Sequence, residues 1–144
     1  MEEVMEESIS SIRHMLNQIQ IETNYDSTII LYCDKQQFKE VFVNMILNAI
    51  EAMPNGGAIR IHFQESFRYH IIQISDTGTG IDKQTLPHIF EPFFTTKRNK
   101  SQNYGIGLAY CCYVVQQHGG FIDVESTKCG TTFSLKFPKC SFLK

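Results

Sequence analysis

The amino-acid sequence predicts an α+β fold, a two-layer α/β sandwich in which helices cover one face of a mixed, mostly antiparallel sheet. Apolar residues recur at helical spacing in two long segments, residues 2–19 and 35–53, whereas several shorter segments are β-rich. The strand segments do not alternate regularly with helices, as they would in a parallel α/β sheet. One sheet with one layer of helices is therefore the expected architecture.

The first long segment is predicted to be a helix packed on the sheet. Its apolar residues follow one another at intervals of three or four positions: Met5, Ile9, Ile12, Leu16 and Ile19. The opposite face is charged or polar, and the pattern is too short for a sustained heptad array. A free coiled coil is therefore the less favoured alternative.

The next two β-rich segments, Ile19–Thr23 and Thr28–Cys33, are predicted to pair as a hairpin. The residues between them, Asn24 to Ser27, are typical of turns. A helix over residues 35–53 follows, and Pro54 to Gly57 supplies its end.

The rest of the chain, from residue 58 on, is predicted to contain four strands, one helix and a long loop. The strands are Ala58–Gln64, Tyr69–Ser75, Phe121–Ser126 and Thr131–Phe137, the helix runs from about residue 105 to residue 117, and the loop covers residues 76–104. Within this loop, residues 95–104 are polar, and we expect them to be mobile.

Length and composition indicate one soluble domain, residues 1–144, because typical domains contain roughly 100–200 residues. The net charge of −2 gives no general reason to bind nucleic acid or an acidic membrane. No apolar run is long enough to span a membrane, and the acidic start does not resemble a signal peptide. The five cysteines include no C-x-x-C pair. We therefore expect a cytoplasmic segment with reduced, mostly buried thiols, although a parent protein could be membrane-anchored elsewhere.

A polar stripe runs beside the apolar face of the predicted helix 35–53. Its members are Gln37, Glu40, Asn44, Asn48 and Glu51. Asparagine is a poor residue for a helix interior, so the pair one turn apart calls for an explanation. A solvated face or capped amides would account for it, but an asparagine oxygen is also a suitable ligand for Mg²⁺ beside phosphate.

A second candidate site follows the strand that ends at Ser75. The D-x-G-x-G sequence from Asp76 to Gly80 suits an ordinary turn, but its glycines also permit a flat ligand to approach the backbone. In a nucleotide site, the Asp76 carboxylate would accept a hydrogen bond from the adenine amine. Guanine presents a carbonyl there, and two acceptors would face each other. The site would therefore prefer ATP to GTP.

The polar loop and the helix after it carry candidate phosphate ligands. The backbone N–H groups at the start of the helix, from Gly105 to Leu108, could bind phosphate, or the glycines could simply give flexibility. Lys97 could neutralise phosphate charge, although basic residues on a polar loop are usually solvated. The aromatic cluster from Phe90 to Phe94 would anchor this loop or act as a hinge.

The order of these elements resembles the GHKL superfamily, whose Bergerat-type ATP site is shared by gyrase, MutL, heat-shock chaperones and histidine kinases. The matching stretches are VNMILNAIEAM for the N box, DTGTG for the G1 box, FEPFFTTK for the F box and YGIGLAY for the G2 box. The residues of these motifs are most similar to those of nitrogen-regulatory and sporulation-type histidine kinases. The resemblance implies the Bergerat fold, with residues 95–104 in a mobile ATP lid.

The resemblance also implies roles for individual residues. Asn48 matches the Mg²⁺ ligand, and Asn44 matches a residue beside the phosphates. Asn44 and Lys97 are the expected catalytic residues. Asp76 matches the adenine-binding aspartate, and Thr132 is expected near adenine. The full set implied to bind nucleotide is Asn44, Asn48, Glu51, Asp76, Gly78, Gly80, Ile81, Phe94, Lys97, Gly105, Gly107, Leu108, Thr131 and Thr132.

Asn44 stands where ATP-hydrolysing relatives have a glutamate base. An amide cannot deprotonate water, so this residue favours transfer to a protein acceptor over hydrolysis. The resemblance thus implies the ATP-binding catalytic domain of a sensor histidine kinase, which uses Mg²⁺ and ATP. The F box favours the same reading.

The implied partners are a dimerisation and histidine-phosphotransfer domain of the same kinase, and a response regulator or phosphorelay protein. The parent kinase is expected to be a homodimer. The acceptor motif, a histidine followed by glutamate and then proline, does not occur in this chain, and His14 does not match it. We therefore expect the dimerisation domain to be absent from this segment.

The sequence is compatible with two alternatives. One is an ATP-hydrolysing or serine-kinase member of the superfamily, and the other is a nucleotide-binding module that has lost transfer activity. The second is kept open by departures from the family pattern at Asn103, Lys128 and Glu51.

Overall fold

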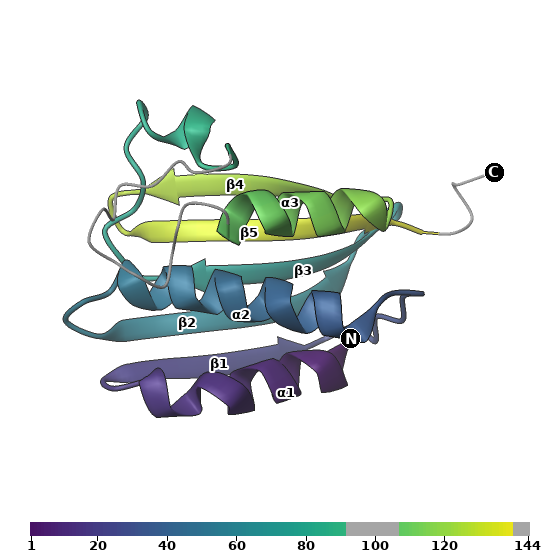
Figure 1. The fold of residues 1–144 in the computed structure, drawn as a ribbon, viewed down its shortest axis with the longest axis horizontal. Coiled ribbons are helices and arrows are strands. Elements are labelled where there is room, and N and C mark those ends of the chain that lie inside the picture. Colours follow the sequence, from purple (N-terminus) through teal and green to yellow (C-terminus); the bar gives the residue numbers. More distant parts are fainter. Residues whose placement is uncertain (92–106, 140–144) are drawn as a thin grey trace.

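The computed structural model describes residues 1–91 and 107–139, which form one sheet and one layer of helices (Figure 1). The strands lie in the order β1-β2-β3-β5-β4; β1 and β2 are parallel and the other neighbours are antiparallel. The elements are α1 (Glu2–Ile12), the 3₁₀ helix η1 (Arg13–Met15), β1 (Ile19–Tyr25), α2 (Lys35–Glu51), β2 (Gly57–Glu65), β3 (Tyr69–Asp76), the 3₁₀ helix η2 (Leu86–His88), α3 (Gly107–Gln117), β4 (Phe121–Thr127) and β5 (Gly130–Pro138).

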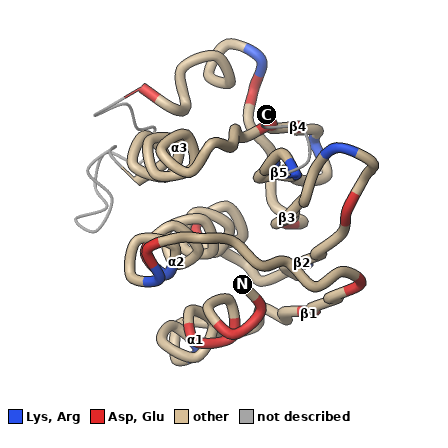
Figure 2. The backbone as a smooth tube through the Cα atoms, turned by 90° about the vertical axis from the view of Figure 1, so that its right-hand side faces the viewer, with Lys and Arg blue, Asp and Glu red and all other residues tan. Residues whose placement is uncertain are grey.

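All three α-helices cover the same face of the sheet, as the end-on view shows (Figure 2). Between the layers lies one core, whose fully buried members include Phe38, Phe42, Phe63, Ile72 and Leu135. The other face of the sheet is mostly polar, with a Lys136–Asp123 ion pair of 2.8 Å among its contacts, and the rings of Tyr69 and Phe121 pack edge to face on it. The predicted α+β sandwich with a mixed, mostly antiparallel sheet is therefore confirmed.

The helix α2 forms where the sequence predicts one. Asp34 caps its first turn, because its carboxylate accepts a hydrogen bond of 3.1 Å from the Gln37 N–H. Its apolar stripe faces the core along the whole length. The helix ends at Glu51, two residues before the predicted limit, and the turn that follows places Gly56 at φ +95°.

The prediction of one helix over residues 2–19 is wrong in its second half. The helix α1 ends at Ile12, and the chain then makes a 3₁₀ turn and a left-handed residue, Gln18 with φ 60°, before β1 begins at Ile19. The apolar spacing continues past Ile12 because Leu16 and Ile19 contact the same core from a turn and a strand. Periodicity alone does not separate these cases.

The predicted hairpin is also wrong. The strand β1 pairs in parallel with β2, and residues 28–33 form no strand. They connect β1 to α2 with Ile29 buried, and the Ile29 carbonyl accepts a hydrogen bond of 3.0 Å from the N-terminal ammonium. Ile30 in this connection is 80% exposed. The β-rich pattern here therefore reflects the burial of the single residue Ile29 and not strand pairing.

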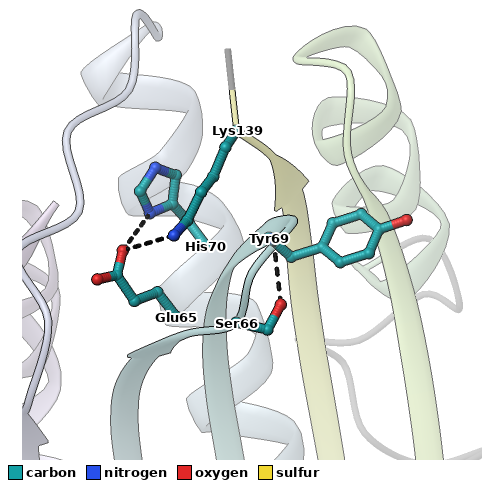
Figure 3. A network of polar contacts seen from close by, with 5 residues as sticks. All are labelled: Glu65, Ser66, Tyr69, His70 and Lys139. Atoms are coloured by element: carbon teal, nitrogen blue, oxygen red, sulfur yellow. Dashed lines mark hydrogen bonds and ion pairs between the residues drawn. The ribbon is translucent and has the colours of Figure 1, made fainter. Parts of the chain in front are cut away.

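A polar network fixes the turn between β2 and β3 to the end of β5 (Figure 3). The Glu65 carboxylate lies 3.1 Å from the Lys139 ammonium and 3.9 Å from Nδ1 of His70. The Tyr69 N–H donates to the Ser66 hydroxyl at 3.1 Å. Since β3 starts at Tyr69 and ends at Asp76, this network lies at the opposite end of β3 from Asp76.

Four cysteines fall in the described part of the chain, and all four are free thiols. Only Cys111 is fully buried, and burial raises its pKa to about 12. Cys129 is exposed, so the expectation of mostly buried thiols holds only in part. None of the helices described is long and apolar enough to cross a membrane.

Candidate functional site

The candidate site lies where β3 ends and the chain turns toward α2. The Asp76 carboxylate is held there by two backbone donors, the Gly78 N–H at 2.9 Å and the Thr131 N–H at 3.3 Å, both to Oδ1. One donor is local and the other comes from β5, so the carboxylate is fixed both by its own turn and by the sheet. Such an oriented carboxylate can accept a hydrogen bond from a ligand amine.

The loop after Asp76 packs against the C-terminal end of α2. A side chain at Gly78 would bring its Cβ to 2.5 Å from the Ala52 carbonyl oxygen, so only glycine permits this approach. The Thr79 N–H points to the same carbonyl at 3.4 Å, and the Ala58 N–H donates to the Thr77 hydroxyl at 3.0 Å. The loop is therefore seated on α2 and on the start of β2.

This contact places the C-terminal end of the polar stripe of α2 next to the loop. The Ala52 N–H donates to the Asn48 carbonyl at 3.1 Å, so Asn48 lies one helical turn before the loop contact. Asn44 lies one turn further, and Asn44, Asn48 and Glu51 are all half-buried. The structure thus brings Asp76 and the asparagine pair to neighbouring parts of one region.

The helix α3 packs beside α2 over the sheet (Figure 1). The buried Cys111 thiol lies 3.6 Å from the Val41 carbonyl oxygen of α2. The pKa of Tyr110 on α3 is raised to about 12, first by burial and then by the Glu40 carboxylate on α2. Gly107 and Leu108 form the first turn of α3, where backbone N–H groups lack helical partners.

The loop also packs against the turn between β4 and β5. Gly80 has φ +78°, and a Cβ there would lie 1.9 Å from the Thr127 carbonyl oxygen. A Cβ at Gly130 would lie 2.0 Å from the Asp76 carbonyl oxygen. At the end of the loop, the Ile81 N–H donates to the Ser126 hydroxyl at 2.7 Å. Two close backbone approaches and this hydrogen bond, together with the one from the Thr131 N–H to Asp76, thus join the loop to this hairpin.

The two threonines of β5 face different sides. Thr131 is 4% exposed and donates its N–H to Asp76, whereas the Thr132 hydroxyl lies 2.9 Å from the Ser75 hydroxyl. Successive strand residues alternate between faces, so Thr131 is the one at the candidate site. This geometry favours Thr131 over Thr132 as the threonine beside a bound base.

Known proteins are similar to this chain in both sequence and fold. A profile of the histidine kinase-, DNA gyrase B- and HSP90-like ATPase family matches residues 33–141. The chain belongs to this family. The resemblance predicted from the N, G1, F and G2 boxes is thereby confirmed at the level of the family.

Sensor kinases are among the relatives of this family member. Sporulation kinase A of Bacillus subtilis (strain 168) is 39% identical over 126 residues, which cover 86% of this chain and 20% of that kinase. The sensory histidine kinase/phosphatase NtrB of Rhizobium leguminosarum bv. phaseoli is 31% identical over 137 residues, covering 83% of this chain and 35% of NtrB. The chain therefore spans only a minor part of these relatives.

Solved structures of histidine kinases share the fold. The mycobacterial sensor histidine kinase MprB matches with a TM-score of 0.83 at 26% identity, covering 95% of this chain and 93% of that chain. The histidine kinase ThkA, solved in complex with the response regulator protein TrrA, matches with a TM-score of 0.74 at 27% identity. That match covers 100% of this chain and 42% of the ThkA chain.

The donor set of this ATPase-family site suits a metal that is shared with phosphate. The residues at 1–91 and 107–139 contain no group of three or more His, Cys, Asp or Glu that could hold a metal ion. The amide oxygen of Asn48 is of the hard type that Mg²⁺ accepts and could supply one ligand, with phosphate oxygens and water supplying the rest. The residues present fit such an ion.

Three of the predicted site residues, Phe94, Lys97 and Gly105, lie outside the described residues. Sequence reasoning missed Ser126 and Ala52, which contact the loop. Ser126 is a polar residue on the side of β4 where Ile122 and Val124 meet the core, and this break in the pattern was the only signal. Ala52 contributes a backbone carbonyl, which sequence does not distinguish.

Proposed function

We propose that the chain binds Mg²⁺–ATP and forms the catalytic domain of a sensor histidine kinase. The observation that supports this most is the Asp76 carboxylate, oriented by two N–H groups in a loop that is seated on α2 one turn after Asn48. The carboxylate is an acceptor suited to the base, and the amides are oxygen ligands suited to a metal beside the phosphates.

Adenine selectivity would come from Asp76. A carboxylate has about four acceptor positions, so it can take a ligand amine in addition to its backbone donors. Guanine offers a carbonyl oxygen instead, and leaving acceptors unpaired in a partly buried site costs about 1–3 kcal/mol each. The half-buried Gly78 and Gly80 would let the base approach the loop backbone. Ile81 would pack on the base.

The phosphates would lie along α2 and the first turn of α3. Asn48 would ligate Mg²⁺, which offsets phosphate charge when it is bound, and Asn44 and Glu51 would lie beside it. Gly107 and Leu108 would present backbone N–H groups and the positive end of the helix dipole. Lys97, Gly105 and Phe94 remain predicted contacts of the lid.

The reaction would be transfer rather than hydrolysis. Phosphoryl transfer depends mostly on positioning and charge stabilisation, and Asn44 cannot act as the base that hydrolysis requires. The bond between the γ-phosphorus and the bridging oxygen breaks, a phosphorus–nitrogen bond forms on an imidazole, ADP leaves and the imidazole loses a proton. The imidazole belongs to a histidine on a separate dimerisation helix.

The proposed partners are therefore proteins. They are the dimerisation and phosphotransfer domain of a homodimeric parent kinase, and a response regulator or phosphorelay protein that receives the phosphoryl group. The ThkA complex with TrrA supports the second partner. We propose no contact of this domain with nucleic acid or membrane, and a cytoplasmic location.

The transfer reaction is tested by incubating the chain with γ-labelled ATP, Mg²⁺ and the cognate phosphoacceptor segment. We expect acid-labile, base-stable label on the histidine of that segment. Phosphoserine on a protein partner, or rapid release of phosphate by the chain alone, would contradict the proposal and favour the related serine kinases or hydrolases. Tight ATP binding without any transfer would contradict it in favour of a non-catalytic nucleotide module.

A further inference from the structure

Ser126 stands at the centre of a small hydrogen-bond network under the loop. Its hydroxyl oxygen accepts from the Ile81 N–H at 2.7 Å and lies 2.9 Å from the Thr131 hydroxyl. Its proton can go to the Gly130 carbonyl at 3.5 Å. A serine hydroxyl has one donor and two acceptor positions, so these three partners match its full capacity.

The network continues to the adenine-binding carboxylate through Thr131. This residue is 4% exposed, and its own N–H donates to Oδ1 of Asp76 at 3.3 Å. The chain of contacts therefore runs from Ile81 through Ser126 and Thr131 to Asp76. It links the two ends of the loop, Asp76 and Ile81, to one hairpin.

Close backbone contacts with the β4–β5 hairpin restrict the conformation of the loop. Gly80 lies against the Thr127 carbonyl and Gly130 lies against the Asp76 carbonyl, and at both places even a Cβ would clash. The hairpin surface is therefore matched to the loop in shape. Ser126 is the only side chain of β4 for which a hydrogen bond to the described part of this loop is seen.

We infer that Ser126 is a positioning residue for adenine recognition. It holds Ile81 and Thr131 in place, and thereby sets the direction in which the Asp76 carboxylate meets the amine of the base. This inference rests on the proposed function, in which Asp76 accepts from adenine. Ser126 itself does not contact the nucleotide.

We predict that the loss of nucleotide affinity in Ser126→Ala depends on the exocyclic amine of the base. Without the hydroxyl, the Ile81 N–H and the Thr131 hydroxyl lose a partner, the loop relaxes, and the carboxylate loses its alignment. Binding of ADP should weaken roughly tenfold in Ser126→Ala. Binding of purine riboside 5′-diphosphate, which lacks the exocyclic amine, should change less than about twofold, because Asp76 makes no bond to it.

Calorimetric titration of the chain with these two diphosphates tests the inference. Ser126→Thr keeps the hydroxyl and should restore most of the ADP affinity. Ser134→Ala is the matched control, because Ser134 lies in the same hairpin and its hydroxyl accepts only from the Gln73 amide, at 3.3 Å, among the contacts seen. It should leave both affinities unchanged.

Three results would overturn the inference while leaving the proposed function intact. Equal losses for both ligands in Ser126→Ala would show a general structural role, and unchanged affinities would show none. Failure of Ser126→Thr to recover ADP binding, with unfolding temperature unchanged, would show that the hydroxyl is not what matters. No binding of ADP by the unaltered chain would instead overturn the proposed function, and this inference with it.

Discussion

Asp76 is the residue in which the sheet, the loop and the proposed ligand meet. Asp76→Asn keeps the size of the side chain but replaces one carboxylate oxygen by an amide donor, which would face the adenine amine or a backbone N–H. We expect ATP affinity to fall at least about tenfold, as for loss of a charged hydrogen bond. Calorimetric titration with ATP measures this, and circular dichroism checks the fold. Undiminished affinity would remove Asp76 from the site.

Asn48 offers a test at the other end of the nucleotide. If its amide oxygen ligates Mg²⁺, Asn48→Ala should weaken ATP binding in Mg²⁺ by about tenfold but change it little in EDTA. The difference between the two conditions separates metal ligation from a purely structural role. Asn24→Ala, at an exposed position on β1, serves as the control. Equal losses with and without Mg²⁺ would contradict the assignment.

Among single residues, sequence reasoning singled out those whose pattern is local. Asn44 and Asn48 are visible because they repeat over one helical turn, and Asp76 because glycines follow it. Ser126 was not predicted, since its partner Ile81 is 45 positions away and is joined through a backbone N–H. Such a contact exists only after β4, β5 and the loop are assembled.

The loop from Asp76 to Ile81 and the β4–β5 hairpin behave as matched elements. Gly80→Ala should combine left-handed strain, about 1–2 kcal/mol, with a clash against the Thr127 carbonyl. We expect a lower unfolding temperature and weakened ATP binding. Scanning calorimetry and titration measure the two effects.

Gly119 provides the control for this prediction. It has a similar φ of +81°, but a Cβ there would meet nothing within 4 Å. Gly119→Ala should therefore show the strain alone and keep full ATP affinity. If the two variants were equally stable and bound ATP equally, the close packing of loop and hairpin would not matter for the site.

Most elements were predictable, and the exceptions have a physical reason. The helix α2 and the strands β2 to β5 carry regular patterns bounded by turn residues. The first helix was predicted too long because Leu16 and Ile19 reach the same core from non-helical backbone. The hairpin prediction was wrong because β-rich composition does not identify the partner strand. The strand β1 pairs with β2, which follows it in the sequence only after α2.

In the whole molecule, α1 and β1 extend a core that the rest of the chain shares. Met5 on α1 is fully buried in this core. Met5→Ala should reduce the free energy of unfolding by about 2–5 kcal/mol through lost burial and a cavity. Thermal unfolding should remain a single transition at lower temperature, whereas Ser10→Ala on the exposed face should have little effect. A separate early transition would contradict one cooperative core.

The strand order β1-β2-β3-β5-β4 could not be predicted from the sequence, although a mixed and mostly antiparallel sheet was predicted. This order matters for function, because it places β5 beside β3 and so brings the Thr131 N–H to Asp76. The site is thus a product of the topology as well as of its motifs.

The central claim is that this fold holds an adenine-selective site, and competitive titration of the chain with Mg²⁺–ATP and Mg²⁺–GTP tests it most directly. We predict that ATP binds at least about 100-fold more tightly than GTP, because Asp76 can pair only with the adenine amine. Equal affinities for the two nucleotides, or no binding of ATP, would contradict it.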